Sequence, residues 1–181
     1  MNMRRTVQLR ETLTGTDPTA TPVASLIVLH GLGSAGRGFA ALVSELNLSA
    51  VGCVRYVFPD APLRTVSVNG GAQMRAWYDP RPVPDGVDPA SVIDEEGMRA
   101  SQQIVQALID REIARGVAHN RIALTGFSQG AVMTLMAGLR APQRLGGLVA
   151  LSGYLPLASQ TAAEASAANR DVPIFLAHGT Q

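Results

Sequence analysis

The sequence of 181 residues contains no lysine and only one cysteine, and these shortages bear on nucleic-acid binding and on disulfide bonding. All 15 cationic side chains are arginines, scattered along the chain and offset by 14 acidic residues, so the net charge is +1. Without a basic block, we expect no nucleic-acid partner. Cys53 has no second cysteine with which to form an intrachain disulfide, which predicts a reducing compartment and therefore a cytoplasmic protein.

Long apolar runs are also missing from the sequence. No stretch approaches the roughly 18 consecutive apolar residues of a transmembrane helix. Residues 1–10 include basic side chains but no apolar run after them, unlike a secretory signal. The sequence therefore predicts neither a membrane span nor export.

Apolar residues are nevertheless plentiful enough for one core. Hydrophobic residues make up 46% of the chain, charged residues only 16%, and the mean hydropathy is +0.14. Such a chain buries enough apolar surface to offset its conformational entropy, which excludes a disordered protein. Because the length is typical of one domain, we predict a single domain over residues 1–181.

Short apolar runs alternate with amphipathic stretches, a pattern typical of parallel strands joined by crossover helices. The expected strands cover residues 25–29, 54–58, 121–125, 147–151 and 172–177. The expected helices cover residues 39–48, 91–115 and 129–139, with Ser91 as the N-cap of the second. Alternation at Val7, Leu9, Glu11 and Leu13 suggests an antiparallel edge strand. The predicted class is α/β, with a mostly parallel sheet and helices on both faces.

The strongest chemical signal is Gly126-Phe127-Ser128-Gln129-Gly130, which matches the pattern G-x-S-x-G. An apolar strand runs into this motif and a helical segment leaves it, which is the setting of a nucleophile elbow that raises a serine hydroxyl on a sharp turn. Gly126 and Gly130 would allow the strand and the helix to approach closely. The alternative is an ordinary glycine-bounded turn whose serine only caps the helix.

A second motif, His30-Gly31-Leu32-Gly33-Ser34-Ala35-Gly36, follows an expected strand and fits two functions. As an oxyanion loop, it would place the backbone N–H of Leu32 beside that of Gln129, where a substrate carbonyl oxygen becomes negative. As a dinucleotide fingerprint, its glycines fit G-x-G-x-x-G, with Asp60 as the ribose-binding acid. The oxyanion function is favoured because a nicotinamide-binding oxidoreductase would leave the serine motif unused.

Three further motifs accompany these two in the chain: Phe58-Pro59-Asp60-Ala61-Pro62, then Asn69-Gly70-Gly71 leading to Met74-Arg75-Ala76-Trp77-Tyr78-Asp79, and Leu151-Ser152-Gly153-Tyr154-Leu155. Taken together, the motifs resemble the carboxylesterase and acyl-protein thioesterase family of α/β-hydrolases. The resemblance implies a cofactor-free serine hydrolase of short to medium carboxylic esters or thioesters, often a homodimer. It implies Ser128 as the nucleophile, Leu32 and Gln129 as oxyanion donors, and Trp77 as part of the acyl site.

The acid and the base that should follow Ser128 are not evident. Only one histidine, His178, follows Ser128, and Asp171 lies at the opposite end of the expected strand 172–177, roughly 20 Å away. In the family that the chain resembles, the segment matching Ala177-His178-Gly179-Thr180 precedes both triad partners. We therefore expect the 181 residues to lack the triad acid and base, together with the last strand and helix. We expect this chain alone to have little turnover, and the edge of strand 172–177 to be unprotected.

The other histidines and the cysteine point to no further chemistry. His30 belongs to the glycine loop and His119 to a connection, so neither is expected to act as the base, and the three histidines lack metal-ligand spacing. Cys53 opens an apolar strand and is expected to be a core residue.

Because the triad acid and base are not evident, a catalytically incomplete hydrolase fold that acts as a binding module remains an alternative to an active esterase.

Overall fold

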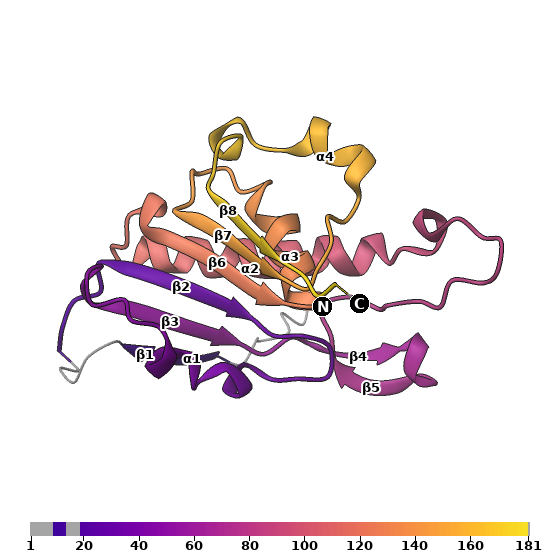
Figure 1. Cartoon of the computed structure of the whole chain (residues 1–181), viewed down its shortest axis with the longest axis horizontal. Coiled ribbons are helices and arrows are strands. Elements are labelled where there is room, and N and C mark those ends of the chain that lie inside the picture. The colour runs from indigo at the N-terminus through magenta and orange to yellow at the C-terminus, as the bar shows by residue number, and fades with distance from the viewer. Residues whose placement is uncertain (1–8, 14–18, 181) are drawn as a thin grey trace, which may run out of the picture.

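The computed structural model describes residues 9–13 and 19–180, and its centre is a six-stranded sheet in the order β1-β3-β2-β6-β7-β8 (Figure 1). The strands are β1 (Leu9–Leu13), β2 (Ala24–Leu29), β3 (Val54–Pro59), β6 (Ile122–Phe127), β7 (Gly147–Leu151) and β8 (Ile174–Ala177). Only β1 is antiparallel to its neighbour within this sheet. The predicted α/β class with a mostly parallel sheet is confirmed.

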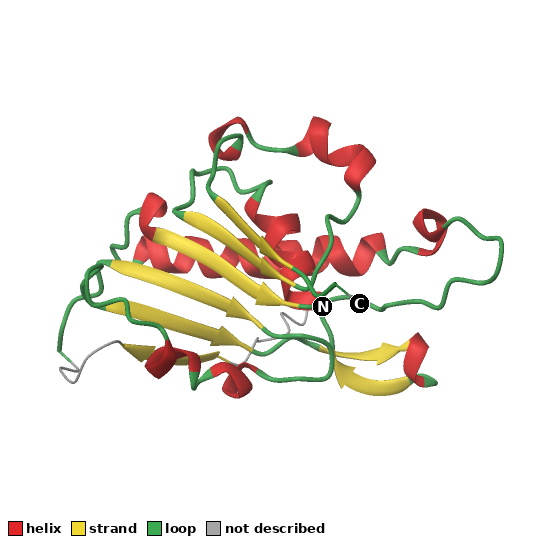
Figure 2. Ribbon diagram, in the orientation of Figure 1, coloured by secondary structure: helices red, strands yellow, loops and turns green. Residues whose placement is uncertain are grey.

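Helices cover both faces of this sheet (Figure 2). The α-helices are α1 (Leu42–Glu45), α2 (Glu95–Ala114), α3 (Gln129–Gly138) and α4 (Ala158–Glu164). Short 3-10 helices cover Gly36–Phe39, Ser67–Asn69, Pro89–Val92, His119–Arg121 and Ala167–Asn169. Apolar residues of α2 and α3 share one core with β2 and β6, while α1 packs with β3 on a second, smaller core. All ten residues of α3 are buried, so the helix that follows Ser128 is the most enclosed helix of the described chain.

The strand order places the two glycine motifs side by side. Strand β2 pairs in parallel with β6, and Leu29 lies opposite Gly126 in that pairing. The loops after β2 and β6 therefore leave the sheet at the same edge, at the carboxyl ends of the strands, where α/β proteins bind their ligands.

Two of the expected helices differ from the structure. Helix α2 begins at Glu95, and its cap is Asp94, whose carboxylate accepts the Gly97 N–H at 3.1 Å; Ser91 instead donates to the Asp88 carbonyl oxygen. The prediction of Ser91 as the cap was therefore wrong. The expected helix 39–48 is present only in part, as the single turn α1 (Leu42–Glu45), and a separate 3-10 turn ends at Phe39. Neither turn has a side-chain cap that would stabilise a longer helix.

The strands agree more closely with expectation. The predicted edge strand is β1, paired with β3, although Val7 lies outside the described residues. Strand β8 begins at Ile174 and not at residue 172, because Pro173 has no N–H to donate. The segment 59–89 holds an unpredicted hairpin of β4 (Leu63–Val66) and β5 (Ala72–Arg75).

Strand β8 is the outermost strand of the sheet, next to β7. Its apolar side chains are exposed, with 60% of the Phe175 surface and 65% of the Leu176 surface accessible to solvent. Within the described chain this edge is therefore unprotected, as expected. None of the helices in the described ranges is both long and apolar enough to cross a bilayer.

Candidate active site

Ser128 occupies the turn between β6 and α3 in a backbone conformation that serine rarely adopts. Its φ is 53° and its ψ is −119°, and the turn is held by hydrogen bonds from the Ser128 N–H to the Leu151 carbonyl oxygen at 2.8 Å and from the Ala131 N–H to the Ser128 carbonyl oxygen at 2.9 Å. Positive φ in a non-glycine residue is strain that surrounding structure must enforce. The half-buried Ser128 lines a cavity of about 140 Å³.

The glycines on either side of Ser128 allow the main chain to pack without side chains between the segments. A Cβ atom on Gly126 would overlap the backbone of Gly130, and one on Gly130 would overlap the carbonyl oxygen of Leu29. Gly31 lies on the other side of the serine, because a Cβ atom there would be 3.4 Å from the Ser128 Cβ. The nucleophile-elbow geometry predicted for this motif is therefore present.

The two predicted oxyanion donors lie beside the serine. Leu32 and Gln129 line the same 140 Å³ cavity as Ser128. Gln129 is the first residue of α3, so its N–H has no acceptor within the helix. Neither the Leu32 N–H nor the Gln129 N–H donates a hydrogen bond to another residue in the described ranges. Both groups are therefore available to a bound oxygen atom.

The Gln129 side chain has a second role that the sequence did not reveal. Its Oε1 accepts the Trp77 N–H at 2.7 Å, and its Nε2 donates to the Tyr78 carbonyl oxygen at 2.9 Å. The side chain is buried and connects the start of α3 to the loop after β5. One residue thus offers its backbone to the cavity and holds the cavity wall with its side chain.

Trp77 is fully buried and lines neither of the two cavities described here. Its indole N–H donates to the His30 carbonyl oxygen at 2.9 Å, and the neighbouring Tyr78 takes the position in the cavity wall. The geometry makes Trp77 a support for the loops around Ser128. Its expected contact with an acyl chain stays a prediction.

His30 is a buried support of the oxyanion loop. Its Nδ1 donates to the Gly31 carbonyl oxygen at 2.7 Å, and its Nε2 accepts the Ala61 N–H at 2.9 Å. Burial lowers the pKa of His30 below its ordinary value, so the imidazole stays neutral at physiological pH. Both ring nitrogens are occupied, in agreement with the expectation that His30 is not the base.

Asp60, the acid of the dinucleotide alternative, is used within the protein. Its Oδ1 accepts the Gly36 N–H at 2.8 Å, and its Oδ2 lies 3.3 Å from the guanidinium of Arg75. Gly36 packs on β3, where a Cβ atom would lie 2.5 Å from the Phe58 carbonyl oxygen. Asp60 therefore connects the glycine loop to the end of β3. In the dinucleotide alternative, the same carboxylate would have to bind the ribose.

None of the three histidines, all in the described ranges, forms a hydrogen bond with Ser128. His119 bonds the Arg144 carbonyl oxygen, while the exposed His178 bonds the carbonyl oxygen of Gly179. Asp171 pairs with Arg144, which precedes the first residue of β7. Asp171 therefore lies at the amino ends of the parallel strands, whereas Ser128 lies at their carboxyl ends, as expected. His119, His178 and Asp171 are therefore each bonded away from Ser128.

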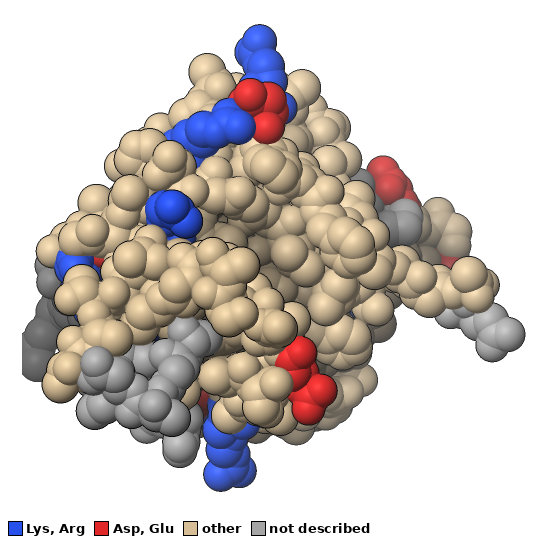
Figure 3. Space-filling model, turned by 60° about the vertical axis from the view of Figure 1, so that its left-hand side comes forward, with Lys and Arg blue, Asp and Glu red and all other residues tan. Residues whose placement is uncertain are grey.

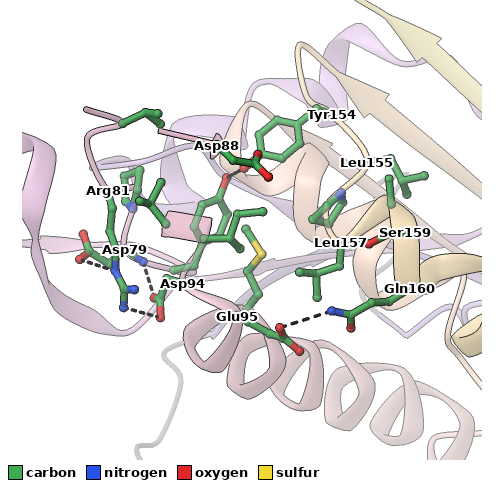
Figure 4. A pocket seen from close by; sticks show the side chains of 18 residues that line it. Asp79, Arg81, Asp88, Asp94, Glu95, Tyr154, Leu155, Leu157, Ser159 and Gln160 are labelled. Atoms are coloured by element: carbon green, nitrogen blue, oxygen red, sulfur yellow. Dashed lines mark hydrogen bonds and ion pairs between the residues drawn. The ribbon is translucent and has the colours of Figure 1, made fainter. Parts of the chain in front are cut away.

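A second, larger cavity of about 640 Å³ is shown in Figure 4. One wall comes from the segment 78–98 and the other from residues 154–160. The side chains that line it are partly apolar, and its first wall also carries the carboxylates of Asp79, Asp88, Asp94 and Glu95. Three residues, Tyr78, Pro80 and Tyr154, line both cavities, which makes the two spaces neighbours.

Charged side chains hold the walls of the larger cavity in place. Asp94 accepts the Asp79 N–H at 2.7 Å in addition to capping α2. Glu164 of α4 accepts hydrogen bonds from Arg99 and Arg140, both at 2.7 Å, and the two guanidinium groups lower the pKa of the carboxyl. Helix α4 is thereby attached to α2 and to the end of α3.

The likeness to known proteins agrees with this site. The chain matches the phospholipase/carboxylesterase family over residues 15–181. The chain belongs to this family. It is 40% identical to acyl-protein thioesterase 1 of Yarrowia lipolytica, over 89% of this chain and 70% of that protein. It is 38% identical to acyl-protein thioesterase 1 of Schizosaccharomyces pombe, over 91% and 71%.

Solved structures give the same assignment. The crystal structure of Arabidopsis thaliana SOBER1 matches with a TM-score of 0.79 and 32% identity, covering 87% of this chain and 74% of that one. Zea mays acyl-protein thioesterase 2 matches with a TM-score of 0.73 and 30% identity, covering 94% and 75%. The α/β-hydrolase fold and a serine hydrolase of esters or thioesters are thus established, and the dinucleotide and binding-module alternatives are not supported.

Proposed function

We propose that Ser128 attacks the acyl carbonyl of a carboxylic ester or thioester and forms an acyl-enzyme that water then hydrolyses. One observation carries this proposal. The serine stands on a strained turn and lines a cavity that it shares with Leu32 and Gln129, whose backbone N–H groups donate to no other described residue. Acyl-protein thioesterases among the relatives support thioesters as one substrate class.

The reaction follows from these groups. As the Ser128 oxygen bonds to the carbonyl carbon, the carbonyl oxygen becomes negative, and the Leu32 and Gln129 N–H groups donate to it. Each such donor typically lowers the barrier by about 3 kcal/mol because it is already oriented when the charge develops. As the bond to the leaving group breaks, the departing alkoxide or thiolate takes up the proton that a base removed from Ser128. Water then attacks the acyl-enzyme, releases the carboxylic acid and returns the proton to Ser128.

The group that removes the Ser128 proton is a separate requirement. Because none of the three described histidines forms a hydrogen bond with Ser128, we expect the 181-residue chain alone to turn over p-nitrophenyl butyrate slowly, at the residual rate that oxyanion donors and binding support. Millimolar imidazole, an external base, is expected to increase that rate.

Covalent labelling tests the nucleophile directly. With imidazole present, a fluorophosphonate is expected to modify Ser128, which mass spectrometry of the digested protein would detect, and Ser128→Ala should abolish the modification. Ser152→Ala is the matched control, because Ser152 lines the same cavity and also has positive φ. An unmodified parent chain, or a label that survives in Ser128→Ala, would contradict the assignment.

We further propose that the protein is cytoplasmic and acts on small-molecule esters or thioesters. The single cysteine supports a reducing compartment. On the face shown in Figure 3, the arginines lie in separate small groups, which favours no nucleic-acid partner. The homodimer implied by the family resemblance stays a prediction, which sedimentation of the purified chain would test.

A further inference from the structure

Two tyrosines stand where the serine cavity meets the larger cavity. Tyr78 comes from the loop after β5 and Tyr154 from the loop after β7, and both residues line both cavities. Their hydroxyl oxygens are 3.3 Å apart, so one hydroxyl donates to the other. Figure 4 shows Tyr154 in the wall of the larger cavity. The hydrogen-bonded pair therefore lies where the two cavities share their lining.

The two members of this pair differ in how firmly they are held. Tyr78 is 6% exposed, and Gln129 binds its carbonyl oxygen at 2.9 Å. Burial raises the pKa of Tyr78 well above its ordinary value, so its hydroxyl remains protonated and able to donate. Tyr154 is 52% exposed, which leaves its ring free space on the solvent side. Separation of the pair therefore requires movement of Tyr154 and not of Tyr78.

The sizes of the cavities give the separation a consequence. The serine cavity of about 140 Å³ equals the liquid volume of about five water molecules, enough for a short acyl group. The larger cavity of about 640 Å³ offers apolar side chains for a longer chain: Val83, Val92, Ile93, Met98, Leu155 and Leu157. Each methylene group that becomes buried there would improve binding about fourfold.

We propose that the Tyr78–Tyr154 hydroxyl pair is a gate that sets which acyl lengths bind without a penalty. An acyl chain that ends inside the serine cavity leaves the pair intact. A chain too long for the serine cavity enters the larger cavity only after the hydroxyl–hydroxyl bond breaks. The proposal rests on the function assigned above, with the acyl group attached at Ser128.

Binding of fatty acids, the acyl products, tests the gate without requiring turnover. We would measure the Kd of butanoate and of decanoate by calorimetry for the parent chain, Tyr78→Phe and Tyr154→Phe. In both variants no hydroxyl–hydroxyl bond has to break, so decanoate is expected to bind about fivefold more tightly, while butanoate changes less than twofold. Tyr56→Phe is the matched control, because the buried Tyr56 hydroxyl has no partner in the described chain and lies in the second core.

The outcomes separate the gate from the nucleophile. Equal changes for both acids, unchanged binding of decanoate in both variants, or a parent and variants that all fail to bind decanoate would overturn the gate. Thermal unfolding of the two phenylalanine variants establishes that each is folded before binding is compared. The fluorophosphonate label on Ser128, recorded on the same samples, reports on the proposed hydrolase function by itself.

Discussion

The turn around Ser128 and the outer wall of the larger cavity are built by different forces. The turn is enclosed by backbone packed on backbone, with Gly130 against Leu29 and every residue of α3 buried. In the outer wall, Thr161 is the one buried residue of α4, and the helix is fastened by partly exposed ion pairs to Glu164. Close packing tolerates almost no change in volume, whereas exposed ion pairs contribute little energy. The Ser128 turn is therefore held rigidly, while the outer wall of the larger cavity is free to vary.

The largest expected effect comes from a methyl group placed beneath the serine. Gly130→Ala should lower the free energy of unfolding by about 3 kcal/mol or more, because the new Cβ overlaps the Leu29 carbonyl oxygen and backbone must move. Gly147→Ala is the control, since its Cβ would meet nothing closer than 3.6 Å. Urea unfolding measures the free energy of unfolding of both variants. Similar values for the two would contradict the claim that close backbone packing holds the Ser128 turn.

A smaller effect of opposite sign is expected at the serine itself. Ser128→Gly should raise the free energy of unfolding by about 1 kcal/mol, because glycine adopts the φ of 53° without the strain that serine bears. The same change in α1, Ser44→Gly, should lower the free energy of unfolding. Glycine relieves no strain in a helix and only increases the conformational entropy of the unfolded chain. If Ser128→Gly also proves destabilising in chemical denaturation, the turn stores no strain.

The smallest effect is expected in the outer wall and depends on pH. Glu164→Gln should cost no more than about 1 kcal/mol at pH 7. The arginines lower the pKa of Glu164 in the folded protein below its ordinary 4.5, so the stabilisation is present above pH 4.5 and is lost as the pH falls through the folded-state pKa.

Stability curves of the parent and Glu164→Gln at several pH values test this dependence. The two curves should converge in acid, and Glu45→Gln is the control, because the exposed Glu45 has no ion pair in the described chain. A difference between parent and Glu164→Gln that persists below the folded-state pKa would show that the wall is held by packing and not by charge.

The elements near Ser128 were predictable because their signals are local. The β6 strand, the glycines and the start of α3 are contiguous in the sequence, and each has one conformation that suits it. The start of α2 was not predictable in this way. Ser91 and Asp94 are both good caps, and the choice of Asp94 depends on the Asp79 N–H, which a separate loop brings to the same carboxylate.

The amino-acid order alone determined the class of fold, the strained serine and the loop that faces it, because those features follow from short-range periodicity and from residues without side chains. Only the tertiary structure decided that Gln129 holds the Tyr78 loop, that Trp77 is a support, and that the Tyr78 and Tyr154 hydroxyls meet. The two tyrosines are 76 positions apart in the chain, and no local pattern encodes a distance that the packing of a whole sheet sets.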